Sequence, residues 1–252
     1  MDGYSVNIAN GNAAPAAGPE RVVIGNAELW HGDCRDVLPL VSKAAAIISD
    51  PPYGIGYVRG AGGNGFRPKA AQERGCHPIV GDDAPFDPAH LMAFENVLIW
   101  GANHYSARLP PGRWLVWDKL DGRESFGDSF SDADLAWHSR RKGGTRIFRH
   151  LWKGAVFSQK GETFNLRNGA QARSHPTQKP VALMAWCIKQ AGTPSIVCDP
   201  YMGSGTTGEA AVLLGLKFCG VEIERRYFDI SCERIEAAQR QGRMFDADGP
   251  AP

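Results

Sequence analysis

Short, continuously apolar runs alternate along the middle of the chain with longer segments of helical composition. Runs of this kind lack the period-two alternation of a half-exposed strand and are typical of strands buried on both faces. They predict strands at 44–49, 96–100, 113–117, 195–198 and 217–222. Helices are predicted at 180–190, 206–216 and 228–240. The alternation predicts an α/β fold with a doubly wound, mostly parallel sheet.

The two ends of the chain lack this pattern. Residues 1–20 are rich in Gly, Ala, Asn and Pro, and have neither the basic start nor the apolar stretch of a secretory signal. We therefore expect a flexible N-terminal arm over 1–20, a folded body over 21–239 and a flexible tail over 240–252.

Two stretches interrupt the alternation of strands and helices. Residues 54–84 are Gly-rich and basic, and a long connection of this kind either orders over a ligand or stays a flexible surface loop. Residues 138–153 contain six Lys or Arg and no Asp or Glu. Such a run of cations either contacts phosphates or forms a solvated face, as a strand with outward-facing cations also would.

Length, charge and cysteine content limit the classes of protein to which the chain can belong. The chain has 252 residues, the length of one α/β domain with insertions, and 28 Lys and Arg against 27 Asp and Glu. A charge so near zero means that any surface for a polyanion is local. No apolar run approaches the roughly 20 residues of a membrane-spanning helix, so no membrane partner is expected. The six cysteines form no CxxC pair and have no His at metal-ligand spacing, which indicates a reducing compartment and no metal site.

The segment Asp50-Pro51-Pro52-Tyr53 directly follows the predicted strand at 44–49. The carboxyl ends of such strands are where open α/β sheets bind ligands. Two prolines stiffen the backbone and leave its carbonyls free to accept hydrogen bonds. A carboxylate, a rigid carbonyl and an aromatic ring suit a planar substrate that donates two hydrogens, such as the exocyclic amino group of a nucleobase. The alternative is a Pro-rich turn capped by Asp50.

A glycine-rich turn, DPYMGSGTTG at 199–208, joins the predicted strand at 195–198 to a helix. Its glycines let the backbone pass close to a ligand, and the helix N-terminus offers free N–H groups. No GxxxxGK[ST] spacing occurs here, which excludes a P-loop. Glu222 closes the next strand, where an acidic residue commonly binds ribose hydroxyls. Its alternative is an exposed carboxylate at a strand end.

Two further polar segments are less specific. The segment SHPTQKP at 174–180 is typical of the polar residues that precede a helix, with Thr177 as a candidate N-cap. His175 alone is more typical of a hydrogen-bonded structural residue than of a catalytic base. In the segment 30–34, Asp33 is either a helix cap or a cofactor contact.

Together and in this order, the motifs resemble the β-class of S-adenosylmethionine-dependent DNA amino-methyltransferases, which modify adenine N6 or cytosine N4, and most of all their phage, prophage or orphan type. The motifs are DPPY at 50–53, HPTQKP at 175–180, DPYMGSGT at 199–206, GDC at 32–34, GANHY at 101–105, WDK at 117–119 and GVEIERRYFDI at 220–230. The catalytic motif precedes the cofactor-binding half, as in the permuted order of that class. The chain departs from the family in having Tyr201 where Phe is usual, and a short segment between WDK and HPTQKP.

The resemblance implies a Rossmann-like methyltransferase fold of permuted motif order, acting on a base flipped out of duplex DNA. Its catalytic residues would be Asp50, Pro51, Pro52 and Tyr53. Tyr53 would stack on the base, while Asp50 and the Pro51 carbonyl accept the two amino hydrogens. No metal and no covalent nucleophile are implied, because a sulfonium is already a good leaving group.

S-adenosylmethionine is the cofactor that the resemblance implies. It would lie over Asp199 and the turn at 203–205, with Glu222 on the ribose, Asp33 near the adenine, and Lys179 and Thr177 along the methionine end. The implied cofactor-binding set is Asp33, Asp50, Thr177, Lys179, Asp199, Tyr201, Gly203, Ser204, Gly205, Thr206 and Glu222.

Double-stranded DNA is the implied partner, recognised through the insertions at 54–84 and 122–173. Candidate phosphate contacts are Arg59, Arg67, Lys69, Arg140, Arg141, Arg146 and Arg149. The sequence gives no readable base code, because groove contacts depend on geometry.

Adenine N6 is the implied target, because Asp at the first position of the tetrapeptide favours adenine in this family, whereas Ser favours cytosine. N4-cytosine methylation is the alternative. A catalytically silent nucleic-acid-binding protein and a small-molecule or RNA methyltransferase are hypotheses of other classes. The resemblance also implies a cytoplasmic location in a bacterial or phage-infected host and a role in DNA methylation or restriction-modification, and it leaves a homodimer open.

Overall fold

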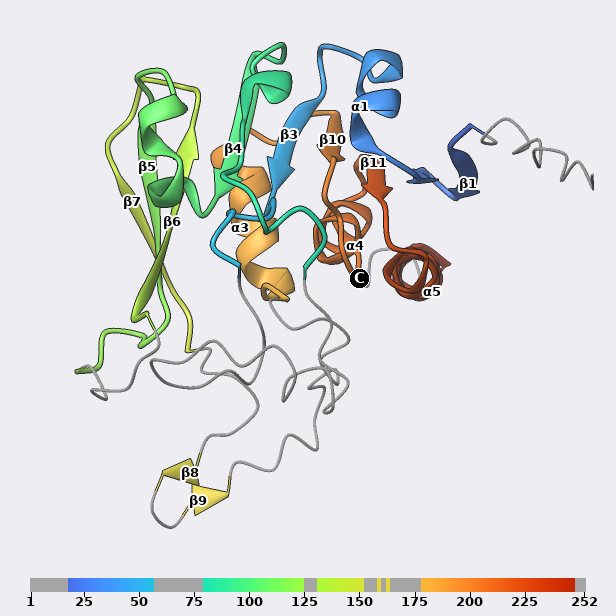
Figure 1. The fold of residues 1–252 in the computed structure, drawn as a ribbon. Helices are drawn as coiled ribbons and strands as arrows, with labels where there is room; N and C mark the ends of the chain where they lie inside the picture. The colour runs from blue at the N-terminus through green and yellow to red at the C-terminus, as the bar shows by residue number, and fades with distance from the viewer. Residues whose placement is uncertain are drawn as a thin grey trace, which may run out of the picture.

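The computed structural model describes residues 18–56, 79–124, 131–151, 158–159, 162–163 and 178–247. A nine-stranded sheet lies at the centre of this part of the chain, in the order β1-β2-β11-β10-β3-β4-β6-β5-β7 (Figure 1). Its strands are β1 Glu20–Ile24, β2 Ala27–His31, β3 Ala46–Ser49, β4 Asn96–Trp100, β5 Arg113–Asp118, β6 Ala133–His138, β7 Arg146–Arg149, β10 Ile196–Asp199 and β11 Lys217–Glu222. Two short strands, β8 Ser158–Gln159 and β9 Glu162–Thr163, form a separate antiparallel pair.

The five central strands β2, β11, β10, β3 and β4 are parallel, so their carboxyl ends lie along one edge of the sheet. We call this the carboxyl edge and the opposite one the amino edge. Strand β1 is antiparallel to β2, and β6 is antiparallel to both β4 and β5. Strand β7 runs parallel to β5, and both therefore end at the carboxyl edge. The expected mostly parallel α/β sheet is confirmed.

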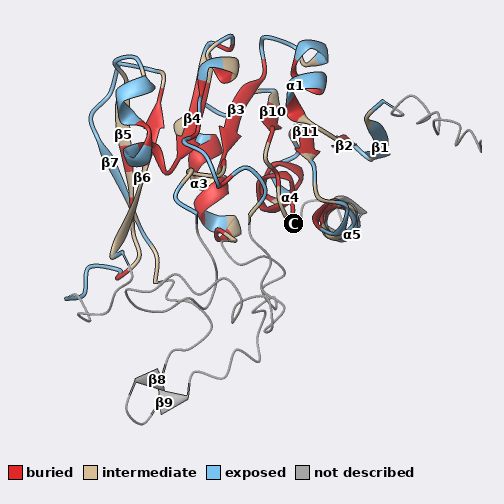
Figure 2. Ribbon diagram, viewed as in Figure 1, coloured by how far each residue is buried: buried red, intermediate tan, exposed pale blue. Residues whose placement is uncertain are grey.

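Helices and turns cover both faces of the sheet. The helices are α1 Cys34–Val37, α3 Val181–Gln190, α4 Thr206–Leu213 and α5 Arg225–Ala247, with 3-10 turns at Leu38–Leu40, Ala89–Leu91, Ala102–His104 and Ser106–Arg108. Helices α3, α4 and α5 lie side by side on one face (Figure 1). In β3, Ile48 packs with these helices, whereas Ile47 belongs to a second core on the other face, with Val37 and Leu91. Burial on both faces explains why the central strands are continuously apolar (Figure 2).

The predicted strands correspond to β3, β4, β5, β10 and β11, and the predicted helices to α3, α4 and α5. The end of the chain differs from expectation: α5 begins at Arg225 and continues to Ala247, so residues 240–247 are helical rather than a flexible tail. The single Gly242 costs a helix only about 1 kcal/mol, which is too little to end it. Helix α4 ends earlier than predicted, at Leu213, ahead of Gly215 in the left-handed region. Residues 1–17 of the expected N-terminal arm lie outside the described residues.

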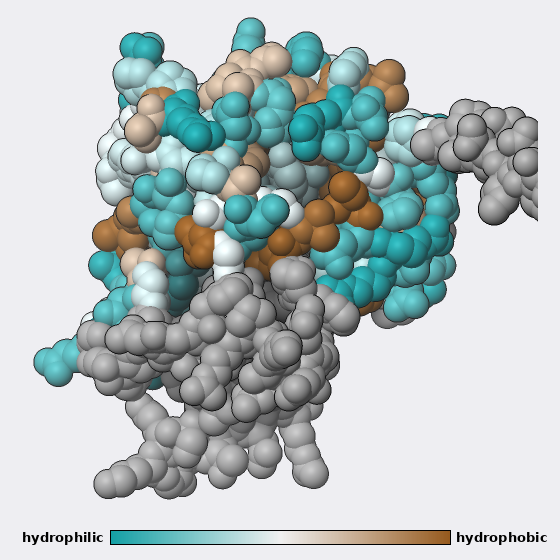
Figure 3. All heavy atoms as spheres, in the orientation of Figure 1, coloured by the Kyte–Doolittle hydropathy of each residue, from teal (hydrophilic) through white to brown (hydrophobic). Residues whose placement is uncertain are grey.

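On the face shown in Figure 3, the described surface is mainly hydrophilic, with apolar groups set among the polar ones. Large exposed apolar side chains, including Val23, Leu40 and Ile147, come from different elements. In the part of the chain that the structure describes, no helix has both the length and the apolar character needed to cross a membrane.

Truncating a buried leucine tests this packing. Leu98 in β4 has no exposed surface, whereas Leu40 is 67% exposed. We expect Leu98→Ala to lower the free energy of unfolding by about 2–5 kcal/mol, because it removes buried methyl groups and leaves a cavity. Leu40→Ala should change it by no more than about 0.5 kcal/mol. Urea unfolding followed by circular dichroism measures both, and equal losses would contradict the assignment of the core.

Candidate active site

Two loops that are far apart in the sequence meet at the carboxyl edge of the sheet. The segment Asp50–Tyr53 follows β3, and the glycine-rich turn follows β10, the strand hydrogen-bonded to β3. The last residues of the two strands are joined directly, because the Ser49 hydroxyl donates a 2.6 Å hydrogen bond to Asp199. The two strongest motifs of the sequence therefore belong to one site.

Asp199 is a buried carboxylate that holds this junction together. Besides Ser49, it accepts hydrogen bonds from the Thr207 hydroxyl at 2.6 Å and from the Tyr201 backbone N–H at 3.1 Å. Burial raises the pKa of Asp199 to about 6, although these three hydrogen bonds favour its charged form. Its oxygens are thus engaged in positioning β3, the turn and α4 relative to one another.

The glycine-rich turn is shaped by its backbone and supported from behind by α5. Gly203 and Gly205 both have positive φ, at 52° and 81°. A Cβ at Gly205 would lie 2.9 Å from the Cβ of Ser231 in α5, so the turn and this helix are in close contact. Arg234, also in α5, donates to the carbonyl of Ser204 at 3.2 Å and to the hydroxyl of Thr206 at 3.0 Å. These contacts hold the turn in place directly before the first residue of α4.

Glu222 ends β11 beside the same turn. Its carboxylate accepts hydrogen bonds from the backbone N–H groups of Gly203 at 2.9 Å and Glu224 at 2.7 Å. Burial raises the pKa of Glu222 to about 7 despite these two hydrogen bonds. No Lys or Arg among the described residues forms an ion pair with it. Glu222 is therefore a partly buried, uncompensated acceptor, and the alternative of an exposed strand-end carboxylate is wrong.

Lys179 contacts the Asp50–Tyr53 segment from another part of the chain. It is the residue just before the N-cap of α3. Its ammonium is 2.9 Å from Asp50 Oδ2 and donates to the Tyr53 hydroxyl at 3.2 Å, and that hydroxyl donates to Asp50 Oδ1 at 2.6 Å. Only 6% of the Lys179 side chain is exposed. Burial lowers the pKa of Lys179, but Asp50 and Asp134 outweigh it and leave the pKa above its usual value. The buried Lys179 is therefore a cation at neutral pH.

Sequence reasoning missed one residue of this cluster, Asp134 in β6, and it assigned no role to Lys119. Asp134 Oδ2 lies 3.7 Å from the Lys179 ammonium, and its Oδ1 lies 2.5 Å from that of Lys119. Lys119 belongs to the WDK motif, but no signal pointed to Asp134, because β6 had not been predicted as a strand. Burial raises the pKa of Asp134, and the two lysines outweigh it, so that its pKa is below the usual value.

The Tyr53 ring packs against the GANHY segment at 101–105. His104 stacks on it with ring centroids 5.2 Å apart and an interplanar angle of 15°. Gly101 has a φ of 68°, and a Cβ there would overlap the Tyr53 ring. Burial raises the pKa of the Tyr53 hydroxyl well above its usual value, and the neighbouring Asp50 adds to this effect. Tyr53 is thus a neutral aromatic surface held in a fixed place.

The hydroxyl of Tyr201, the residue where the family usually has Phe, has a partner. It forms a 2.8 Å hydrogen bond with Nε2 of His90, in the 3-10 turn Ala89–Leu91. Both rings also contact Phe86 edge-on. Burial lowers the pKa of His90, which favours the neutral imidazole at neutral pH. Tyr201 therefore joins the glycine-rich turn to the segment that precedes β4.

The remaining cofactor candidates are placed as follows. Asp33 is the N-cap of α1, where it accepts a 2.9 Å hydrogen bond from the Arg35 N–H, and it lies just after Gly32, whose N–H bonds the Glu222 carbonyl at 3.0 Å. The helix-cap alternative is thus confirmed, at a position beside Glu222. Thr177 lies outside the described residues.

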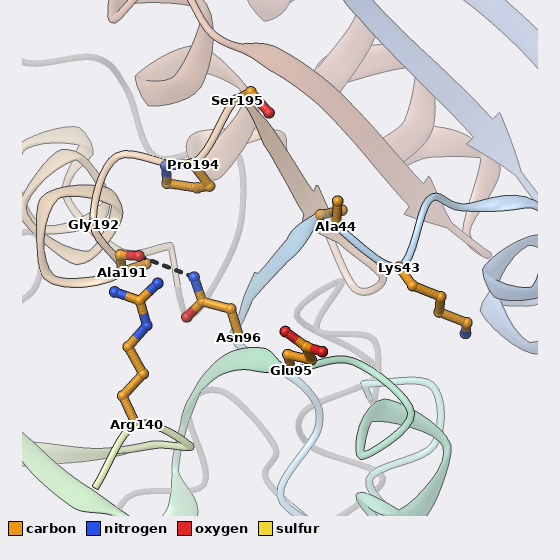
Figure 4. Close-up of a pocket in the computed structure, with 10 residues that line it drawn as sticks. Lys43, Ala44, Glu95, Asn96, Arg140, Ala191, Gly192, Pro194 and Ser195 are labelled. Carbon is orange, nitrogen blue, oxygen red and sulfur yellow. Dashed lines mark hydrogen bonds between the residues drawn. The ribbon is translucent and has the colours of Figure 1, made fainter. Parts of the chain in front are cut away.

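The candidate phosphate contacts are divided between the two edges. Arg149 ends β7 at the carboxyl edge, where it pairs with Asp118 at 3.5 Å, and Arg146 begins the same strand. Arg140 follows β6 at the amino edge, where it helps to line a cavity of about 310 Å³ with Asn96 and Gly192 (Figure 4). Arg141 is the next residue and is exposed. Arg59, Arg67 and Lys69 lie outside the described residues.

Comparisons with known proteins are consistent with this geometry. Residues 112–233 match the N6_N4_Mtase family, described as DNA methylase. The type II methyltransferase M.HinfI of Haemophilus influenzae is 29% identical over 136 residues, which cover 48% of this chain and 38% of that protein. The DNA adenine methyltransferase YhdJ of Escherichia coli K12 is 44% identical over 66 residues, covering 26% and 22%. The chain thus spans less than half the length of these curated relatives.

A solved structure shares the fold. The PvuII DNA methyltransferase, described as cytosine-N4-specific, superimposes with a TM-score of 0.52 over 90% of this chain and 94% of its own, at 12% identity. At this identity the likeness concerns the fold alone. It agrees with the expected Rossmann-like arrangement.

The raised pKa of Glu222 predicts a pH dependence of stability. Its ordinary value of 4.5 becomes about 7 in the folded chain, so between these values the folded state binds a proton that the unfolded state releases. Folding stability from this group therefore falls as the pH rises from 4.5 to 7. We expect the difference in unfolding free energy, wild type minus Glu222→Gln, to be larger at pH 5 than at pH 8 in urea titrations. A constant difference, or a larger one at pH 8, would refute the assignment.

Proposed function

We propose that this chain, which matches the N6/N4 DNA methylase family over residues 112–233, transfers a methyl group from S-adenosylmethionine to an exocyclic amino nitrogen of a DNA base. The observation that carries the proposal is the placement of Asp50–Tyr53 and the glycine-rich turn on adjacent strands, joined by Ser49 and Asp199. A methyl donor bound at the turn and a base bound at Tyr53 would then meet at the same edge of the sheet.

The residues at the turn fit S-adenosylmethionine. Among the described residues, two backbone N–H groups donate to Glu222. A carboxylate has about four acceptor sites, so Glu222 can also accept ribose hydroxyls. Gly203 and Gly205 leave the backbone open to close approach, and α4 presents its N-terminus beside them. When bound, the cofactor supplies a methyl group on a sulfonium, which is already activated for transfer.

The chain's own residues would bind and orient the base. Flipping a base out of the duplex costs a few kcal/mol, and the fixed Tyr53 ring offers stacking in return. Asp50 and the Pro51 carbonyl would accept the two amino hydrogens, turning the nitrogen lone pair away from the ring and toward the methyl group. Pro52 keeps this backbone stiff. Positioning of this kind can contribute roughly 7–11 kcal/mol in favourable cases.

Adenine N6 is the proposed target, with cytosine N4 as the alternative. Asp50 at the head of the tetrapeptide supports adenine, and one curated relative is named a DNA adenine methyltransferase. Double-stranded DNA is the proposed substrate. It would reach the carboxyl edge, where Arg149 lies, and the reaction would serve DNA methylation or restriction-modification in the cytoplasm of a bacterial or phage-infected cell.

Removal of the Asp50 carboxylate tests the reaction. We expect Asp50→Ala to reduce tritium transfer from labelled S-adenosylmethionine to duplex DNA more than 100-fold, because the amino group loses an acceptor that orients it. Cofactor binding measured by calorimetry should persist, since Glu222 and the turn are untouched. Asp229→Ala, at an exposed ion pair with Arg225, is the control. Labelling of tRNA in preference to DNA would favour an RNA methyltransferase, and no labelling by the wild type a silent binding protein.

The modified base can be identified directly. Mass spectrometry of nucleosides, after incubation of mixed-sequence DNA with the wild-type chain and cofactor, should show N6-methyladenine. N4-methylcytosine as the sole product would replace the proposed target by its alternative.

A further inference from the structure

Four charges of alternating sign form a chain across the base-binding end of the site. Asp50 contacts Lys179 at 2.9 Å, Lys179 contacts Asp134 at 3.7 Å, and Asp134 contacts Lys119 at 2.5 Å. The residues come from the loop after β3, the segment just before α3, β6 and the position directly after β5. Lys179 is almost fully buried, whereas about a fifth of each other side chain is exposed. The cluster is electrically neutral as a whole.

Lys179 occupies an oxygen that the substrate needs. In this arrangement Tyr53 donates to Asp50 Oδ1 and Lys179 lies on Asp50 Oδ2. An incoming amino group must share the carboxylate with a buried ammonium. Hydrogen bonds to a charged partner are the strong ones, so the ammonium competes effectively for this acceptor.

The ammonium has a second carboxylate within reach. Asp134 Oδ2 is 3.7 Å away, against 2.9 Å for Asp50 Oδ2, so a displacement of under 1 Å toward Asp134 would bring the ammonium as close to Asp134 as it now is to Asp50. The long lysine side chain has the freedom for such a shift. Lys119 holds the other oxygen of Asp134 and keeps that carboxylate in place.

Resting on the proposed function, we propose that Asp134 is a positioning residue for methyl transfer: it takes over the Lys179 ammonium when Asp50 accepts the amino group of the base. Asp134 contacts neither base nor cofactor in this role. It acts through Lys179 and thereby frees Asp50 for the substrate.

The reaction makes this exchange useful. The amino nitrogen forms a bond to the methyl carbon as the carbon–sulfur bond breaks, and the electron pair of that bond stays on sulfur. The nitrogen thus takes on the positive charge and then loses one proton, which a carboxylate oxygen of Asp50 accepts. An ammonium on that oxygen would oppose both the charge and the proton, because like charges repel at short range. Beside Asp134 the same ammonium is farther away and neutralised.

A double-mutant cycle tests the proposal. We expect Asp134→Asn to lower kcat for DNA methylation about tenfold, with the KM for DNA and cofactor binding by calorimetry unchanged. In the Lys179→Met background no ammonium remains to be moved, so adding Asp134→Asn should change kcat less than twofold. Asp229→Asn removes a carboxylate from an exposed ion pair and should leave kcat unchanged. An equal loss in both backgrounds, or no loss in either, would overturn the proposal.

A second measurement is independent of catalysis. Titration of the Lys179 side-chain nitrogen by nuclear magnetic resonance should give a lower pKa in Asp134→Asn than in the wild type, because a neighbouring negative charge is lost. Asp229→Asn should leave this pKa unchanged. An unchanged Lys179 pKa in Asp134→Asn overturns the coupling even if the chain methylates DNA. A lowered pKa without any methyl transfer by the wild type instead refutes the proposed function.

Discussion

The buried carboxylate of Asp199 is the interaction on which the arrangement of the site depends. A charge this deep is costly to bury unless hydrogen bonds compensate it, and the donors come from three places: the end of β3, the turn after β10 and the first turn of α4. The hydrogen bonds that compensate the buried charge of Asp199 thus also fix the distance between the loop that contains Asp50 and the turn that contains Gly203. The proposed substrate loop and the proposed cofactor turn are therefore two ends of one hydrogen-bonded unit.

A second electrostatic unit begins at Asp50, the first residue of that loop, and includes Lys179 and Asp134 from other parts of the chain. Lys179 has little exposed surface and would be unstable there as an isolated cation, so its burial requires Asp50 and Asp134 whatever their part in the proposed reaction. Because Asp50 serves both the buried lysine and the proposed substrate, stability and activity are coupled at this residue. The carboxylate of Glu222 has the opposite character, since no Lys or Arg in the described part of the chain pairs with it, and a ligand rich in hydroxyl donors would suit it.

Much of this could be read from the sequence, because the information is local. The continuous apolar run before Asp50 predicts a strand buried on both faces, and the glycines of the turn at 199–208 predict a backbone that can pass close to a ligand. In the structure Gly203 and Gly205 both have positive φ. The parts that were not predicted depend on contacts distant in the sequence. Strand β1 is largely exposed and β6 reaches full burial only in its second half, so neither has a continuous apolar signature. Asp134 meets Lys179 only because β6 inserts between β4 and β5, a topology that no local pattern of residues encodes.

The hydrogen bond between Tyr201 and His90 has an evolutionary consequence. The Tyr201 hydroxyl and the His90 ring nitrogen are half-buried and hydrogen-bond to each other, so a substitution of one residue removes the partner of the other. A relative with Phe at the first position would leave the ring nitrogen at the second without its partner, and it gains nothing from keeping a histidine there. The two positions should therefore change together across homologous chains, although the sequence separates them by more than a hundred residues.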